Sequence, residues 1–315
     1  MRPLEGKIAV VAGATRGAGR GIACMLGEAG ATVYCTGRSV RGAPASGQRR
    51  PETIEETAEM VGQHGGVGIH VRTDHTVEEE VEALFDRVRQ EQGGLDILVN
   101  DVWGGDVLTE WDKPFWEHSL AKGRRMLEQA VVSHIITSRF GASLLIDRGG
   151  GAIFEITDGD TYSYRGSFYY DLVKTTVIRL AFSKGYELRK HGVAAVAVTP
   201  GFLRSEMMLE HFGVTEENWR DGAKKDPHFI ASETPFFVGR AIAALAADPE
   251  LLRKTGRVYS SWNLAREYGF SDVDGERPDW GAYFERTFGE PINACDDGFY
   301  RYVERGPLEI VYGEG

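Results

Sequence analysis

The sequence predicts an α/β protein with a doubly wound, mostly parallel sheet of seven strands, and two observations carry this prediction. Short apolar runs alternate with longer helical patterns through most of the 315 residues. The first apolar run leads into a glycine-rich turn, AGATRGAGRGIA, at the start of an expected helix. Repeated strand–helix units build a parallel sheet with helices on both faces, and their right-handed crossovers give an open doubly wound arrangement.

Each expected strand is a short apolar run bounded by glycine, charged or turn-forming residues. The seven runs span residues 7–13, 31–37, 67–73, 95–101, 151–157, 193–201 and 256–262. Their nearly continuous apolar character is typical of parallel strands that are buried on both faces.

The segments between these runs carry helical patterns. The segment 19–30 ends in glycine, and the segment 52–66 begins with acidic residues that complement the helix dipole. The other expected helices cover 76–94, about 113–148, about 168–190 and 234–248, with partly helical structure over 206–231.

The composition argues against several classes of function. A net charge of −11 disfavours nucleic acid as a partner, because phosphate binding needs a basic surface. No apolar run approaches the roughly 18–20 residues of a membrane-spanning helix, and the N-terminus shows no signal-peptide pattern. The three cysteines, Cys24, Cys35 and Cys295, form no Cys/His cluster, so a disulfide framework or a metal site is not expected. We expect a cytoplasmic protein that acts on a small molecule.

The glycine-rich turn predicts nucleotide binding. Gly13, Gly17 and Gly19 allow the backbone to turn tightly and to approach a pyrophosphate. The following helix presents its free N–H groups to the phosphates. We therefore place Thr15, Arg16 and Ala18 of the same turn at the cofactor as well, the alternative being a merely tight turn between strand and helix.

The spacing G-x-x-x-G-x-G resembles the short-chain dehydrogenase/reductase family. The resemblance extends over residues 5–265, with Asp74 after the third strand, Asn100 where the family has N-N-A-G, and Pro200–Gly201 followed by Ser205. It implies a Rossmann-type fold, a nicotinamide cofactor, oxidoreductase activity and a homo-oligomer formed through the helices near 113–148 and 168–190. The resemblance further implies cofactor contacts from three residues beside these markers: His75, Val102 and Leu203.

The end of the second strand favours NADP(H) over NAD(H). Sites that prefer NAD place an acid there for the ribose 2′-hydroxyl, whereas this strand ends in Thr36–Gly37 followed by Arg38 and Ser39. A guanidinium and a hydroxyl suit an additional phosphate, and Arg16 has the length to reach it. NAD(H) stays open as the alternative, since Arg38 also fits an ordinary loop arginine.

Tyr170 and Lys174 are the predicted acid/base pair. They lie four residues apart and so share a helix face, at the carboxyl end of the fifth strand, where chemistry occurs in this fold. Tyr186 and Lys190 have the same spacing, but they lie about 24 Å further along the helix. By resemblance, Tyr170 exchanges a proton with the substrate oxygen and Lys174 lowers its pKa and holds the nicotinamide ribose.

The family's catalytic serine is replaced. Its position falls on Asp158, with Thr157 beside it, and the family's helical asparagine falls on Ala130. Asp158 either donates a hydrogen bond in protonated form, pairs with a cationic or polyhydroxylated substrate, or points away while Thr157 supplies a hydroxyl. Adjacent strand residues face opposite sides, so only one of the two is expected to serve.

Aromatic and methionine side chains crowd the expected rim of the site, and the alternative is that many of them belong to the core or a subunit interface. The candidate substrate contacts are Trp103, Tyr162, Tyr164 and Met207. They indicate a bulky apolar substrate with a polar handle.

Together these features predict an NADP(H)-dependent carbonyl reductase or alcohol dehydrogenase. The alternatives are a non-catalytic NADP(H)-binding sensor and a dehydratase or isomerase on the same fold. We expect residues 1–265 to form one dinucleotide-binding and catalytic domain, with a lid at about 202–233. Residues 266–315 form a C-terminal extension whose periodicity is weak.

Overall fold

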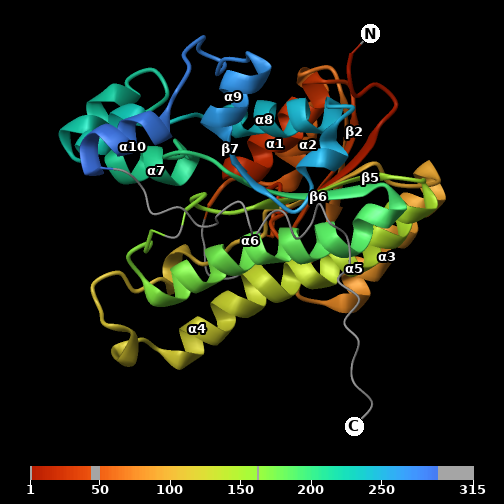
Figure 1. Ribbon diagram of the computed structural model, residues 1–315, viewed down its shortest axis with the longest axis horizontal. Coiled ribbons are helices and arrows are strands. Elements are labelled where there is room, and N and C mark those ends of the chain that lie inside the picture. Colours follow the sequence, from red (N-terminus) through yellow and green to blue (C-terminus); the bar gives the residue numbers. More distant parts are fainter. Residues whose placement is uncertain (1, 44–49, 162, 290–315) are drawn as a thin grey trace.

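A computed structural model describes residues 2–43, 50–161 and 163–289 (Figure 1). The candidate substrate residue Tyr162 and the end of the C-terminal extension lie outside the described residues.

The described chain forms one seven-stranded sheet in the order β3-β2-β1-β4-β5-β6-β7, and every neighbouring pair is parallel. The strands are β1 Ile8–Ala12, β2 Thr32–Gly37, β3 Val67–Arg72, β4 Ile97–Asn100, β5 Gly151–Ile156, β6 Val193–Thr199 and β7 Val258–Ser260. The doubly wound, Rossmann-type prediction is confirmed. The strand order reverses between β1 and β4, and ligands of such sheets bind in the crevice at the carboxyl ends there.

Helices cover both faces of the sheet (Figure 1). One layer consists of α1 Gly17–Glu28, α2 Ile54–Gln63, α8 Pro235–Ala247 and α9 Ser261–Tyr268. The other consists of α3 Glu78–Gln92, α4 Leu120–Leu127, α5 Ser133–Asp147 and α6 Phe168–Leu188. Each layer encloses its own cluster of buried apolar side chains against the sheet.

Two glycines set the contact between α1 and α8. A methyl group on Gly21 would lie 2.0 Å from the carbonyl oxygen of Pro235, and one on Gly239 would lie 2.5 Å from that of Gly21. The two helices therefore approach with their backbones nearly touching. Thr234 caps α8 by accepting a hydrogen bond from the N–H of Phe236, and Pro235 starts the helix without needing a donor.

The region 113–148, expected as mostly helical, contains a break. A π-helical turn over Glu128–Val132 separates α4 from α5, and short 3-10 turns at Asp106–Leu108 and Phe115–Glu117 precede α4. The Ser133 hydroxyl donates to the carbonyl of Gln129 at 2.6 Å within this turn. Such turns widen a helix locally and occur often beside functional sites.

The segment after β6 folds around a small core of its own. It contains α7 Glu206–Phe212 and 3-10 turns at Trp219–Lys224 and Pro227–Ala231, which enclose Phe212, Trp219 and Phe229. The last described helix, α10 Trp280–Phe288, lies beside this segment (Figure 1). The assignment of 202–233 as a lid stays a prediction.

Candidate active site

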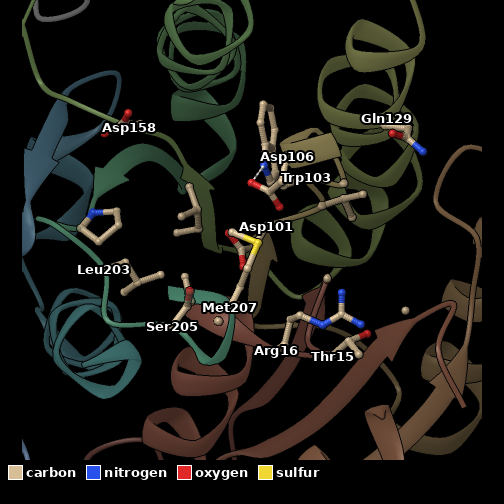
Figure 2. Close-up of a pocket in the computed structure, with 18 of the residues that line it drawn as sticks. Thr15, Arg16, Asp101, Trp103, Asp106, Gln129, Asp158, Leu203, Ser205 and Met207 are labelled. Atoms are coloured by element: carbon tan, nitrogen blue, oxygen red, sulfur yellow. Dashed lines mark hydrogen bonds between the residues drawn. The ribbon is translucent and has the colours of Figure 1, made fainter. Parts of the chain in front are cut away.

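A cavity of about 670 Å³ opens at the carboxyl ends of the central strands. Figure 2 shows Thr15 and Arg16 of the glycine turn on one side, Trp103 and Asp106 across from them, and Leu203, Ser205 and Met207 after β6. The predicted residues that line it are Gly13, Thr15, Arg16, Gly17, Ala18, Arg38, Ser39, Asp74, His75, Val102, Trp103, Thr157, Asp158, Tyr170, Lys174, Pro200, Gly201, Leu203, Ser205 and Met207. The fold thus brings nearly all the sequence-predicted site residues into one cavity.

Gly13 and Gly19 of the turn are required by close contacts, and Gly17 is favoured by its positive φ. Gly13 has φ +92°, and a methyl group on it would lie 2.5 Å from the carbonyl oxygen of Asp101. Gly17, with φ +56°, is the first residue of α1. Gly19 does not line the cavity, but a methyl group on it would meet the Gly13 carbonyl at 2.3 Å. The glycines therefore let the start of α1 lie directly against the end of β4.

The N–H at the start of α1 already has an anionic acceptor. Gly17 donates its backbone N–H to Oε2 of Glu206 at 2.8 Å, and Arg20 lies 3.5 Å from the other oxygen of the same carboxylate. Glu206 is the first residue of α7. A carboxylate from the segment after β6 thus occupies a donor that a helix N-terminus offers to anions.

Asp101 is a second acid at the turn, and sequence reasoning missed it as a site residue. Its carboxyl group accepts a hydrogen bond from the Gly19 N–H, and burial raises its pKa to about 7 although Lys174 opposes the shift. The signal was present in the sequence, because Asp101 stands where the family has the second asparagine of N-N-A-G.

The pocket beside the end of β2 is lined by Arg38 and Ser39. The Arg38 guanidinium lies 3.7 Å from the Asp74 carboxylate and is 36% exposed. Arg16, the other candidate for an additional phosphate, lies with its Nε 3.3 Å from Glu52. Both arginines thus line the cavity, and each faces an acid, Asp74 for Arg38 and Glu52, which Arg50 also contacts, for Arg16.

His75 lies in the cavity floor with both ring nitrogens engaged. They lie 2.8 Å from the hydroxyls of Thr36 and Thr137. Burial lowers the pKa of His75 to about 3, so the ring is neutral at physiological pH. A neutral ring held by two hydroxyls suits a structural role for His75 in the floor of the cavity.

Tyr170 and Asp158 form a direct hydrogen bond. The Tyr170 hydroxyl donates to Oδ2 of Asp158 at 2.8 Å. Burial and the Asp158 carboxylate both raise the pKa of Tyr170 well above its usual value. The rings of Trp103 and Trp111 pack on the phenol with centroids 5.3 and 5.1 Å away.

Lys174 lies one turn further along α6. Its ammonium is 4.3 Å from the ring centroid of Trp103 and 5.6 Å from that of Tyr170. Burial lowers its pKa. The Thr157 hydroxyl donates to the backbone carbonyl of Lys174 at 2.7 Å, so Asp158 and not Thr157 contacts the phenol in this structure.

Arg165 fixes the loop that carries Asp158, and sequence reasoning missed it. Its guanidinium donates to the carbonyl of Asp158, to the carbonyl of Thr161 at 3.0 Å and to the carboxylate of Asp171 at 2.9 Å. One largely buried side chain, 9% exposed, thus links the end of β5 to the first turn of α6.

Asn100 lies beneath the cavity and does not line it. Its amide donates to Ser138 and to Glu155, both at 2.9 Å. Glu155 is fully buried and lies 2.6 Å from the Lys184 ammonium. Burial alone would raise the pKa of Glu155, but Lys184 and His134 hold it at about 2. This ionic network supports the strand end that precedes Asp101.

The candidate substrate residues do not all line the cavity. Trp103 and Met207 line the cavity, whereas Tyr164 is 64% exposed and does not. Two further aromatic residues of the segment after β6, Phe212 and Trp219, lie in its small core. Lining residues that sequence reasoning missed include Asp106, Gln129 and Trp280.

Within the described ranges, no group of three or more His, Cys, Asp or Glu side chains is arranged to hold a metal ion. No helix in the same part of the chain is long and apolar enough to cross a membrane.

The parallel sheet, the glycine turn and a tyrosine–lysine pair meet in one cavity, an arrangement typical of nicotinamide-dependent oxidoreductases. A model of the family described as short chain dehydrogenase matches residues 7–213. The chain is 36% identical over 280 residues to dehydrogenase/reductase SDR family member 1 of Mus musculus, covering 87% of this chain and 86% of that protein. It is 30% identical to the 3-oxoacyl-[acyl-carrier-protein] reductase FabG of Vibrio harveyi, over 81% of this chain and 98% of that one.

Among solved structures, a hydroxysteroid dehydrogenase from Escherichia coli superposes with a TM-score of 0.66 at 25% identity, covering 82% of this chain and 96% of that one. The chain belongs to the short-chain dehydrogenase/reductase family. It is therefore an NAD(P)-dependent oxidoreductase that acts on CH–OH or C=O groups.

Proposed function

We propose that this protein is an NADP(H)-dependent carbonyl reductase for bulky apolar substrates, with Tyr170 as the acid/base and Lys174 as its partner. The supporting observation is the Tyr170 hydroxyl, held at 2.8 Å from Asp158 in the cavity that also contains the glycine turn.

The residues of the cavity fit a nicotinamide dinucleotide. The glycine required at position 13 lets the turn pack closely against the end of β4, and the backbone N–H groups at the start of α1 suit a diphosphate. Arg38 and Ser39 suit the additional phosphate of NADP(H). Gln129 lines the same cavity, and within the described residues its buried side-chain oxygen has no hydrogen-bond partner. When bound, the cofactor supplies the hydride for the carbonyl carbon.

The proton comes from the chain itself. Because its pKa is raised, Tyr170 carries its proton at neutral pH, and it donates that proton to the carbonyl oxygen as the carbon is reduced. Hydride and proton together convert C=O to CH–OH. Donation leaves a phenolate that must regain a proton from solvent before the next turnover. The reverse reaction starts from that phenolate, so the negative Asp158 should shift alcohol oxidation to higher pH. At neutral pH the resting protein holds Tyr170 in the protonation state that reduction needs.

The walls of the cavity favour an apolar substrate. Val107 and Leu108 follow Trp103 on one side, and Phe202, Met207 and Met208 contribute apolar surface on the other. The Escherichia coli structure named as a hydroxysteroid dehydrogenase is consistent with a bulky alicyclic compound.

We also propose that the protein forms a homo-oligomer through the helices that cover residues 120–147 and 168–188. Apolar side chains lie exposed on these elements, among them Leu120, Ile135 and Leu172. Contact with a second copy would remove this surface from water.

The test combines cofactor titration with a screen for carbonyl turnover. We expect NADPH to bind with micromolar affinity and more tightly than NADH. Tyr170→Phe should lower the reduction rate by about 10²–10⁴-fold while leaving NADPH binding nearly unchanged. Tyr186→Phe is the matched control, because Tyr186 lies on the same helix and has the same four-residue spacing to a lysine, Lys190.

The proposal fails if Tyr170→Phe retains full reductase activity. NADPH binding without oxidation in the presence of any carbonyl compound would favour the sensor or the dehydratase and isomerase alternatives instead.

A further inference from the structure

Helix α10 carries an aromatic side chain into the cavity from the C-terminal extension. Trp280, the first residue of α10, lines the cavity together with Gly201 and Phe202. A methyl group on Gly201 would lie 2.7 Å from Cβ of Trp280, so the glycine makes room for the helix. The Trp280 ring meets the ring of Phe202 edge-on at 5.8 Å between centroids and stacks on Tyr283 at 5.6 Å.

Core packing does not explain the position of α10. None of its residues is fully buried, and Phe288 at its end is 55% exposed. A glycine at position 281 is nonetheless required, since a methyl group there would lie 2.3 Å from Nε1 of Trp262 in α9. The first turn of α10 thus packs closely against Gly201 at the cavity and against Trp262 of α9, while the rest of the helix lies at the surface.

The loop before α10, at residues 272–274, is held by contacts to the beginning and to the end of the segment after β6. The backbone N–H and the hydroxyl of Thr234 donate to the buried carboxylate of Asp272 at 2.9 and 2.5 Å. Arg204, which is 2% exposed, lies 3.3 Å from Asp274. These two contacts tie residues 272–274 to positions 204 and 234, so Trp280 has a fixed place relative to the segment 202–233.

The cavity wall formed by the segment after β6 and by α10 is mostly apolar. Its lining side chains include Phe202, Leu203, Met207, Met208 and Trp280, with Ser205 and Glu206 as the polar members. The five apolar side chains carry no charge, whereas the lining also contains Arg16, Arg38 and Asp74 near the glycine turn. The apolar part of this wall therefore suits the non-reacting part of a substrate, and an indole face suits a flat ring.

We infer that Trp280 is a specificity-determining residue that selects carbonyl compounds with fused aromatic or alicyclic rings. This inference rests on the proposed carbonyl reduction. Trp280 acts by contact with the ring system, and it leaves the proton and hydride transfer at the carbonyl to Tyr170 and the cofactor.

The experiment compares two ketones, 2-acetylnaphthalene and cyclohexanone, in full-length wild type, Trp280→Ala, Trp280→Phe and Phe288→Ala. Phe288 is the matched control, because it is an aromatic residue of the same helix that does not line the cavity. The ratio compared is kcat/KM for 2-acetylnaphthalene divided by kcat/KM for cyclohexanone. Trp280→Ala should lower this ratio by about tenfold or more. Trp280→Phe should restore part of that ratio, and Phe288→Ala should change it by less than about twofold.

A binding measurement separates this inference from the proposed function. The affinity of 2-acetylnaphthalene for the protein loaded with NADP⁺ is measured by calorimetry in the same four proteins. Binding that Trp280→Ala weakens, without turnover of any carbonyl, supports Trp280 and overturns the proposed reduction. A wild type that reduces both ketones with a ratio unaffected by Trp280→Ala overturns Trp280 and leaves the reduction standing. Wild type that does not bind the aromatic ketone also overturns the role of Trp280.

Discussion

Replacing Asp158 by serine tests whether this carboxylate sets the pH range in which Tyr170 can act as a base. Asp158 accepts the hydrogen bond of Tyr170 at 2.8 Å, so ionising the phenol would place two negative charges side by side. At a separation of about 4 Å and an effective dielectric constant of about 20, the repulsion is about 4 kcal/mol. That energy corresponds to about 3 pKa units. Because the cavity is open to water, screening reduces the expected shift to about 1–2 units.

The assay is the pH dependence of alcohol oxidation, measured as formation of NADPH. In the wild type the phenolate forms only at high pH, so the oxidation rate should still be rising in the alkaline range. Asp158→Ser should move the rising part of the pH–rate profile about 1–2 pH units lower. The rate of reduction near neutral pH should change only a few-fold. Asp158→Asn, which keeps the size of the side chain and removes its charge, should move the rising part of the profile in the same direction.

A substrate-free measurement accompanies the assay. The ultraviolet absorbance of phenolate, with Tyr170→Phe as the blank, should show Tyr170 titrating at lower pH in Asp158→Ser than in the wild type. If neither the oxidation profile nor the titration moves, the carboxylate does not control the pKa of Tyr170, and the reasoning about the pH dependence is wrong.

Two further predictions concern the cofactor pocket. Arg38→Ala should weaken NADPH binding by about 10–100-fold and leave NADH binding within about threefold, because only NADPH offers a phosphate to the guanidinium. Arg41→Ala, which removes an exposed arginine paired with Glu59, is the control in this titration, and equal losses for both cofactors would contradict the assignment. The raised pKa of Asp101, about 7, means that the folded protein holds this proton more tightly than the unfolded chain does. The stability that this proton contributes is present below about pH 4 and is lost as the pH rises towards 7. Asp101→Asn should therefore raise Tm by a few degrees near pH 8 and by almost nothing near pH 4 in thermal melts, since its amide oxygen still accepts from Gly19. An equal change at both pH values would show that ionisation of Asp101 is not responsible.

The sheet and the position of the site were predictable because they rest on local patterns. Apolar runs alternate with helical segments in a fixed order, and the glycine turn follows the first strand. The motif positions after the second, third, fifth and sixth strands therefore meet at one edge of the sheet. Asp158 was predicted as the replacement of a serine, and the structure places it against Tyr170.

The features that escaped prediction depend on contacts between distant segments. Trp280 reaches the cavity because Gly201 leaves space for it, although 79 positions separate the two residues. Arg165 acts through backbone carbonyls, which no side-chain pattern reveals. The π-helical turn at Glu128–Val132 lies within a continuous helical pattern, because hydrophobic periodicity does not register one additional residue in a turn.

The bond between Gly17 and Glu206 has a consequence for anion binding at the glycine turn. A backbone N–H has one hydrogen to give, so a phosphate that takes the Gly17 donor must displace the Glu206 carboxylate. Glu206 begins the helix that carries Met207 and Met208 into the cavity. The Glu206 carboxylate and a phosphate therefore exclude each other at this donor. The carboxylate occupies an anion-binding position at the first residue of the helix that carries two methionines of the cavity wall.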